Sequence, residues 1–163
     1  MAEQGEQGDP APGRAALVAE AAAVSRRCMA SYALLTQAVA DRLRLHPTDV
    51  QCLSLLGLET GSVTTGRIAE LTGLTTGSAT RLVDRLERAG YVVRRRDTED
   101  RRRVLVEGVP ERMRGFAAVW EESRGPWDEL FQAYDESELA LLVRHMNRTV
   151  ELNTSRGARR PRG

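Results

Sequence analysis

The chain has 163 residues, of which 41% are hydrophobic and 29% are charged, enough for one domain with its own core and helical extensions. No apolar run approaches the roughly 18 residues that a membrane-spanning helix needs, which argues against a membrane protein. All 24 basic residues are arginine, and this excludes a Schiff-base lysine and a complete Walker A phosphate-binding loop.

The arginines are concentrated in the middle of the chain. Residues 1–60 hold 5 arginines against 7 acidic residues, residues 61–108 hold 10 against 7, and residues 109–163 hold 9 against 9. A central basic excess in a chain of net charge +1 is typical of a nucleic-acid site, but a solvated surface would give the same counts. Charge alone leaves both interpretations open.

The N-terminal part predicts a tail and then one long helix. Residues 1–13 are rich in Gly, Pro, Gln and acidic residues, and we expect them to be disordered. They lack the basic and then apolar pattern of a secretory signal, so we expect a cytoplasmic protein. From Arg14 to about Leu43, apolar residues recur every three or four positions and form one stripe: Leu17, Ala21, Val24, Cys28, Tyr32, Leu35, Val39 and Leu43. Such a helix is too long for a small core, so we expect it to pair with another helix, such as one from a second subunit.

The next segment predicts a short buried helix. His46-Pro47 should end the long helix. Thr48 then suits an N-cap whose capping box is completed by Gln51, and the helix should run to about Leu58. Residues 60–66 are rich in Gly, Ser and Thr and predict a turn-rich connector.

Two helices separated by a tight turn follow. Residues 67–71 predict a short helix and Thr72-Gly73-Leu74 the turn, after which Thr75 caps a second helix that runs to about Ala89 and ends at Gly90. The apolar face of the second helix comprises Ala79, Leu82, Val83 and Leu86, and its other side presents Ser78, Arg81, Arg85 and Arg88.

The arginine-rich part of the chain predicts a β-hairpin. Residues 91–93 and 104–106 are apolar and β-branched enough to be strands, and the connector between them, residues 94–103, holds six arginines and three acidic residues. After the hairpin, Pro110 suits the first turn of another helix, which Gly125-Pro126 interrupts.

The C-terminal part predicts one more amphipathic helix. Asp135-Glu136-Ser137-Glu138 forms a second capping box, and the helix after it has an apolar face from Leu139 to Val150. Residues 154–163 predict a basic, unstructured tail.

A short helix, a glycine turn and an amphipathic second helix constitute a helix-turn-helix, whose second helix directs its N-terminal residues at base edges in the major groove of DNA. Small polar residues followed by arginine suit that geometry, and the candidate contacts are Thr75, Thr76, Gly77, Ser78, Arg81 and Arg85. For this helix alone, an ordinary solvated surface is the alternative.

The hairpin that follows fits a wing that reaches an adjacent minor groove, where the potential of DNA is most negative. Its candidate residues are Arg95, Arg96, Asp97, Asp100, Arg101, Arg102 and Arg103. We expect Asp97 and Asp100 to hold the arginines in extended rotamers by charge-assisted hydrogen bonds.

These two motifs carry a resemblance to a known family. The segment GRIAELTGLTTGSATRLVDRLERAGYVVR, residues 66–94, and the segment DTEDRRRVLV, residues 97–106, resemble the MarR family of transcriptional regulators, and the likeness extends over roughly residues 25–155. The resemblance implies a dimer with intertwined N- and C-terminal helices that binds palindromic operators and mostly represses. It places base reading on Thr76, Gly77, Ser78 and Arg81, and wing contacts on Asp97, Asp100, Arg101 and Arg102. Glu99 stands where the family commonly has an arginine.

The expected fold is therefore mainly α with a small β-hairpin wing. We expect a disordered tail at 1–13, an N-terminal dimerisation helix at 14–46, a winged helix-turn-helix lobe at 47–108, C-terminal helices for dimerisation at 109–153 and a basic disordered tail at 154–163. The apolar stripes predict dimer contacts at Leu17, Val24, Leu139, Leu142, Met146 and Val150.

The sequence also offers candidates for a ligand pocket and for an oxidant-sensing cysteine. Some members of the resembled family bind anionic aromatic molecules, which makes Tyr32, His46, Met113 and Trp120 candidates for a pocket, with packing in the core as the alternative for each. Others sense oxidants with a cysteine, but Cys28 lies on the apolar stripe and we expect it to be a buried, insensitive thiol. Cys28 and Cys52 lack the spacing of a metal or redox motif.

The predicted function is a sequence-specific transcriptional regulator, a repressor that binds a palindromic operator as a homodimer and is released by a small aromatic or anionic ligand. The alternative is a ligand-independent or architectural protein for double-stranded DNA. We find no Gly-rich phosphate loop, nucleophile elbow or paired-carboxylate motif and expect no enzyme, cofactor or metal. The expected partners are double-stranded DNA, a second copy of the chain and a small-molecule effector, without a membrane, and the expected location is the bacterial cytoplasm, at the nucleoid when bound.

Overall fold

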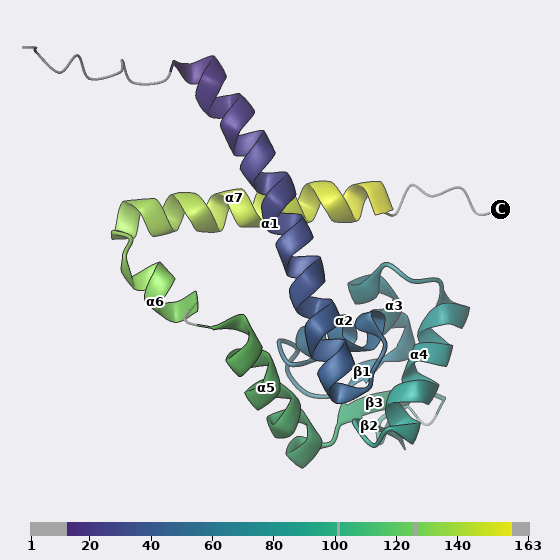
Figure 1. The fold of residues 1–163 in the computed structure, drawn as a ribbon. Helices are drawn as coiled ribbons and strands as arrows, with labels where there is room; N and C mark the ends of the chain where they lie inside the picture. The colour runs from purple at the N-terminus through teal and green to yellow at the C-terminus, as the bar shows by residue number, and fades with distance from the viewer. Residues whose placement is uncertain (1–12, 101, 126, 158–163) are drawn as a thin grey trace, which may run out of the picture. The chain divides into compact units, whose positions relative to one another are not determined.

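The computed structural model describes residues 13–100, 102–125 and 127–157. The chain divides into two compact units, residues 1–35 and residues 36–163, with the boundary inside the long helix α1 (Arg14–Leu43; Figure 1). The bounds of α1 are those that its apolar periodicity predicts. The tails predicted at residues 1–13 and 154–163 lie largely outside the described residues.

The apolar stripe of α1 is exposed within the first unit. Leu17, Val24 and Tyr32 are exposed there, and so is Cys28. The prediction that Cys28 is buried is therefore wrong for the single chain. The physical reason is that the described part of this unit consists of one helix, so no second element covers the stripe.

The core of the second unit lies between three helices and a small sheet: α2 (Pro47–Leu56), α3 (Thr65–Thr72), α4 (Thr76–Arg88), β1 (Val63–Thr64), β2 (Val92–Arg96) and β3 (Val104–Gly108). The sheet is antiparallel in the order β1-β3-β2. The fully buried apolar side chains of the core include Val39, Val50, Leu53, Ile68, Ala79, Leu82, Val83, Leu86, Val92 and Val106. The mainly α fold with a hairpin wing is thus confirmed, and each buried side chain of α4 lies on its predicted apolar face.

Helix α2 begins two residues earlier than predicted. His46, not Thr48, is the N-cap, Pro47 is in the first turn, and the Nδ1 atom of His46 accepts a hydrogen bond from the Thr48 N–H at 3.3 Å. The capping box is closed by Asp49, whose Oδ2 accepts from the His46 N–H at 3.4 Å, and not by Gln51. Proline favours the first helical position because its missing N–H would have no partner there. The helix also ends at Leu56, before the predicted Leu58.

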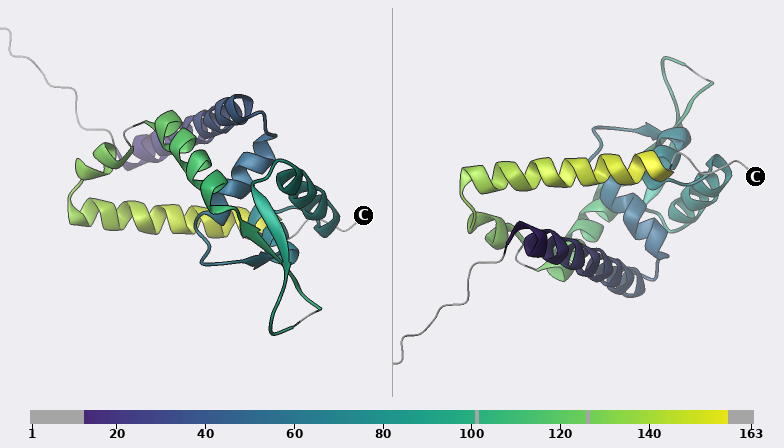
Figure 2. Two further views of the ribbon diagram at one scale, coloured as in Figure 1. Left: turned by 90° about the horizontal axis from the view of Figure 1, so that it is seen from below. Right: turned by 90° about the horizontal axis from the view of Figure 1, so that it is seen from above.

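The predicted connector at residues 60–66 contains a short strand. Val63 pairs with Val106 and Thr64 with Leu105, and the Thr64 side chain then caps α3 by accepting from the Arg67 N–H. The two long strands also extend further than predicted, because Arg94, Arg95 and Arg96 continue the ladder against β3. Both views of Figure 2 show the connector beyond these strands projecting away from the helices of the lobe.

Three helices complete the second unit: α5 (Pro110–Arg124), α6 (Trp127–Gln132) and α7 (Glu136–Gly157). The predicted capping box of α7 is confirmed, since Asp135 accepts from the N–H groups of Ser137 and Glu138, and Glu138 accepts from the Asp135 N–H. Helix α7 continues to Gly157, past the predicted start of the tail at residue 154. In the part of the chain that the structure describes, no helix is long and apolar enough to cross a membrane.

Candidate DNA-binding surface

The turn between α3 and α4 sets the direction of the second helix. Gly73 has a φ of 67°, a left-handed conformation that costs glycine little and other residues more. Thr75 then caps α4, with its Oγ1 accepting from the Ser78 N–H at 3.3 Å. Both features agree with the prediction from the sequence, and they place a free helix N-terminus on the surface of the lobe.

The N-terminal turn of α4 presents small polar groups beside one arginine. Thr76, Gly77 and Arg81 are exposed, and the Nη2 atom of Arg81 donates to the Ser78 Oγ at 3.4 Å. A Cβ built on Gly77 would meet no atom within 4 Å, so its backbone is open to a close approach from outside. This surface offers hydroxyl groups, a bare backbone and a guanidinium, which are groups that can meet base edges and phosphates.

Arg85, also predicted on this surface, is engaged elsewhere. Its Nη2 and Nε atoms donate to the two carboxylate oxygens of Asp49 at 2.6 and 3.2 Å, and the Asp49 side chain is only 3% exposed against 40% for Arg85. The hydrogen bond to Asp49 raises the pKa of Arg85, against an opposing effect of burial. Arg85 therefore links α4 to α2. If its guanidinium left the pair to bind DNA, the buried carboxylate of Asp49 would lose its ion-pair partner.

The wing acids bind mainly backbone groups. Asp97 accepts from the Glu99 N–H at 2.9 Å, and Asp100 accepts from the Arg102 N–H at 3.0 Å. The only wing arginine within ion-pair distance of them among the described residues is Arg103, at 3.7 Å from Asp97. The expectation that these acids hold arginine rotamers is thus largely wrong, because short aspartate side chains reach the amides of their own turn first.

The wing arginines differ in what they contact. Arg95 pairs across the hairpin with Glu107 at 2.8 Å. Arg96 and Arg102 are exposed, and within the described ranges neither side chain has an ion pair. Arg101 lies outside the described residues. Among the described wing arginines, Arg96 and Arg102 are therefore the cations most available to an external anion.

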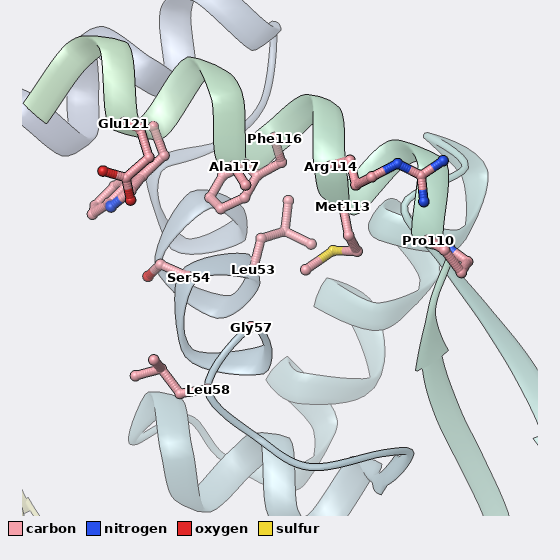
Figure 3. A pocket seen from close by; sticks show the side chains of 11 residues that line it. Leu53, Ser54, Gly57, Leu58, Pro110, Met113, Arg114, Phe116, Ala117 and Glu121 are labelled. Atoms are coloured by element: carbon pink, nitrogen blue, oxygen red, sulfur yellow. The ribbon is translucent and has the colours of Figure 1, made fainter.

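A cavity of about 410 Å³ lies between α2 and α5. Figure 3 shows Leu53 of α2 and Met113 of α5 facing each other across it. Trp120 also lines the cavity, and its ring stacks on Phe116 with centroids 6.1 Å apart. Of the predicted pocket residues, the structure thus brings Met113 and Trp120 together. It places His46 at the cap of α2 instead, and Tyr32 belongs to the first unit and stays a prediction.

The second cysteine is inert by its surroundings. Cys52 is 1% exposed on α2, and burial, with a smaller contribution from the Asp49 carboxylate, raises the pKa of its thiol to about 12. Over the described ranges, no group of three or more His, Cys, Asp or Glu side chains is arranged to hold a metal ion.

The chain matches known proteins over this same region. The model of the MarR family matches residues 45–103, from just before α2 to the residue that precedes β3. The HTH-type transcriptional regulator YcgE of Bacillus subtilis is 37% identical over 119 residues, which are 73% of this chain and 77% of YcgE. The chain belongs to the MarR family.

Solved MarR family structures agree with the fold. A MarR family protein from Bacillus stearothermophilus is similar with a TM-score of 0.65 and 23% identity, covering 88% of this chain and 99% of that one. CouR from Rhodococcus jostii RHA1, solved with p-coumaroyl-CoA bound, is similar with a TM-score of 0.61 and 23% identity, covering 80% and 89%. These structures show the winged-helix fold, and the family match and the likeness to YcgE show that this MarR family chain is a DNA-binding transcriptional regulator.

Some residues of this MarR family lobe were missed by sequence reasoning. The sequence did not single out Asp49, the partner of Arg85, nor Arg94 and its partners Asp84 and Glu87. For Arg94 the available signal was strand alternation, since Val92 and Arg94 point to one face of β2 while Val93 and Arg95 point to the other. The apolar lining at Leu53 and Phe116 could not be distinguished from ordinary core by its spacing.

Proposed function

We propose that this regulator is a repressor that binds a palindromic operator as a homodimer, with the N-terminal turn of α4 in the major groove and the wing in the adjacent minor groove. The observation that carries the proposal is the pairing of two exposed elements in direct succession. One is the polar turn of α4 around Gly77 and Arg81. The other is the hairpin with Arg96 and Arg102, whose side chains have no ion pair with any described residue. A helix N-terminus with a bare backbone suits close approach to base edges, and extended arginines suit a narrow groove.

The dimer is supported by apolar side chains that a single unit leaves exposed. On α1, Leu17 and Val24 are 51% and 46% exposed, and on α7, Met146 and Val150 are 44% and 60% exposed. Leu139 and Leu142 of α7 are half-buried. Exposed apolar residues at helical spacing over two long helices mark an association surface, and a second copy of the chain is the partner that a palindromic operator requires.

The cavity between α2 and α5 supports release of DNA by an aromatic, anionic ligand. Its lining is mostly apolar, with Leu53, Met113, Phe116 and Trp120 on its walls and Arg114 among its polar residues. The related CouR was solved with p-coumaroyl-CoA bound. An aromatic ring would be buried by the apolar walls, and a guanidinium can pair with a carboxylate. A ligand-independent DNA-binding protein is the alternative if no such molecule binds.

Selection of bound duplexes from a random pool tests the proposal. We expect enrichment of an inverted repeat with half-sites about 10 base pairs apart, bound by a species of twice the chain mass in sedimentation equilibrium. Enrichment of no sequence, or binding by a monomer, would contradict it. Release of the selected duplex is then tested with 4-hydroxyphenylacetate and benzoate, and a failure of both anions to release it would favour the ligand-independent alternative.

A further inference from the structure

Arg94 is the β2 arginine directed at α4, which we call the recognition helix after its proposed role. Its Nη2 atom donates to the Asp84 Oδ1 at 2.6 Å, and its Nη1 atom donates to the Glu87 Oε2. Its backbone N–H also donates to the Glu87 Oε1 at 3.2 Å. The guanidinium, the main chain of β2 and two carboxylates of α4 thus form one connected network, which we call the Arg94 clamp.

The position of the clamp follows from the strand and helix periods. Val92 and Arg94 share a face of β2, and Val106 lies opposite Arg94 on β3. Val92 and Val106 are both 1% exposed, so this face of the sheet is directed into the lobe. Asp84 and Glu87 are three residues apart and therefore neighbours on α4. Arg94 meets them where the buried face of the hairpin reaches the polar flank of the helix.

The clamp does not offer its positive charge to DNA. One guanidinium faces two carboxylates, so the cluster is negative as a whole, and the Arg94 side chain is 26% exposed against 70% for Arg95. A phosphate brought to this point would meet both carboxylates. Arg94 therefore differs from Arg96 and Arg102, which are exposed two and eight positions further along the hairpin.

We propose that Arg94 is a positioning residue that fixes the wing relative to the recognition helix, and so fixes the spacing between the major-groove and minor-groove contacts. This inference rests on the proposed function, because it takes for granted that α4 and the wing both contact DNA. The physical reason is geometric. A guanidinium has a rigid, planar set of donors, so it holds two carboxylates of α4 at defined distances from β2. The single ammonium group of a lysine, on its flexible side chain, cannot reproduce this geometry.

When the two carboxylates of the clamp are neutralised, a positioning role predicts weaker DNA binding, whereas charge alone predicts tighter binding. The double variant Asp84→Asn/Glu87→Gln removes two negative charges from each DNA-binding lobe, and by charge alone it should bind DNA more tightly. If the clamp positions the wing, the same variant should bind the selected operator about tenfold more weakly, an affinity change that corresponds to about 1.4 kcal/mol. Arg94→Lys keeps the charge but not the two-carboxylate geometry and should weaken binding in the same direction.

The experiment is hydroxyl-radical footprinting of the full-length chain on the operator selected above, with titrations of operator and scrambled duplex. In both clamp variants we expect protection at the centre of each half-site to stay and protection of the flanking minor groove to fade. Glu111→Gln is the control for charge removal, because it removes an exposed acid at the start of α5, outside both the clamp and the proposed DNA-binding surface, and should keep both footprints. Circular dichroism melts of each variant establish that it is folded, and Arg94→Lys carries the test should the double variant not fold.

Each outcome has a distinct meaning. Clamp variants that bind the operator as tightly as the unmodified chain, with both footprints intact, would overturn the role of Arg94 while leaving the proposed function standing. A further variant, Arg94→Gln, removes the positive charge. If Arg94→Lys binds normally while Arg94→Gln binds both duplexes more weakly by the same factor, Arg94 is a phosphate contact and the positioning role is wrong. An unmodified chain without flanking protection would overturn the proposed wing contact, and this inference with it.

Discussion

The buried carboxylate of Asp49 on α2 accepts two hydrogen bonds from the guanidinium of Arg85 on α4, at 2.6 and 3.2 Å. The same carboxylate accepts from the N–H of His46 and so closes the capping box of α2. One side chain thus contacts both the start of α2 and the middle of α4. The lobe has two such ties on α4, this one to α2 and the Arg94 clamp to β2.

Removing the arginine of this pair should destabilise the lobe more than removing Arg81, which lies on the proposed DNA-binding surface. Arg85→Ala leaves a carboxylate that is almost fully buried without its main partner, and we expect a loss of about 2–3 kcal/mol in the free energy of unfolding. Arg81→Ala, whose side chain is exposed, should change it by less than about 0.5 kcal/mol. Urea unfolding measures both values.

A double-mutant cycle separates the pair from other effects of the substitutions. In Asp49→Ala/Arg85→Ala no charged group is left without its partner, so the loss should be smaller than the sum of the two single losses. Equal losses for Arg85→Ala and Arg81→Ala, or strict additivity in the cycle, would show that the Asp49 pair contributes little to stability.

The thiol of Cys52 should be unreactive toward alkylating reagents in the folded chain. In a Cys28→Ser variant it is the remaining thiol, and the rise of its pKa from 9.0 to about 12 lowers the thiolate fraction near pH 8 about a thousandfold. Burial hinders access as well. We expect no reaction with iodoacetamide in buffer and one modified thiol per chain in urea, as counted by mass spectrometry. Rapid modification of the folded variant would contradict the burial of this side chain.

The same shift has a defined effect on stability. Because the pKa of Cys52 is higher in the folded chain than in the unfolded chain, the fold favours the neutral thiol. Its contribution to stability should be fully present below pH 9 and should be lost as the pH rises toward 12. In the Cys52→Ala variant, this part of the decline in stability at alkaline pH should be absent in urea titrations from pH 8 to 11.

Features set by local signals could be predicted from the sequence. The bounds of α1, the turn at Gly73 and the cap at Thr75 follow from periodicity, a left-handed glycine and a side chain that bonds its own backbone. Strand β1 could not be predicted, because two residues acquire strand geometry only by pairing with β3, about 40 positions further along the chain.

The candidate site shows the same division. The exposed turn around Gly77 was predictable from its own residues. The different roles of Arg85, Arg94 and Arg96 could not be predicted. They depend on whether the fold brings a carboxylate near each guanidinium, and the neighbouring residues in the sequence do not show this. The cap of α2 was predicted at Thr48, but His46 caps the helix, which puts Pro47 in the first turn and Asp49 against Arg85.

Gly77→Ala should stabilise the chain and yet weaken operator binding. A methyl group at this position meets no atom of the chain within 4 Å, and alanine favours a helix over glycine by about 0.5–1 kcal/mol. On the DNA side, the same methyl group occupies the surface that we propose to approach base edges. We expect a higher urea midpoint and an operator affinity about tenfold lower, with less effect on scrambled DNA.

Gly115→Ala is the matched control for this prediction. Gly115 lies inside α5, also with no atom within 4 Å of a built Cβ, and outside the proposed DNA-binding surface. It should raise the urea midpoint to a similar extent and leave operator binding unchanged. If Gly77→Ala binds the operator as well as Gly115→Ala does, the backbone at Gly77 does not lie close to DNA.

Alanine substitutions of the arginines on the recognition helix and on the wing should change DNA binding in different ways. Arg81 lies one turn into α4 beside Ser78, where a guanidinium can fork onto a guanine. Arg81→Ala should therefore cost about 1–3 kcal/mol on the operator and relax the preference at one base position of each half-site. Repeating the selection from a random pool with this variant measures which position is relaxed.

Arg102 is exposed on the hairpin and should act through the charge of the groove and its phosphates. Arg102→Ala should weaken binding to operator and scrambled duplexes by similar factors, because this electrostatic contribution does not depend on the sequence. Each phosphate contact that is lost should lower the slope of log affinity against log salt by about 0.9, and a dimer with two wings should lose about twice that. Titrations of both duplexes across a salt series give the slope directly. An unchanged slope together with unchanged affinities would mean that the wing does not touch DNA, whereas a loss confined to the operator would make Arg102 a reader of sequence rather than of charge.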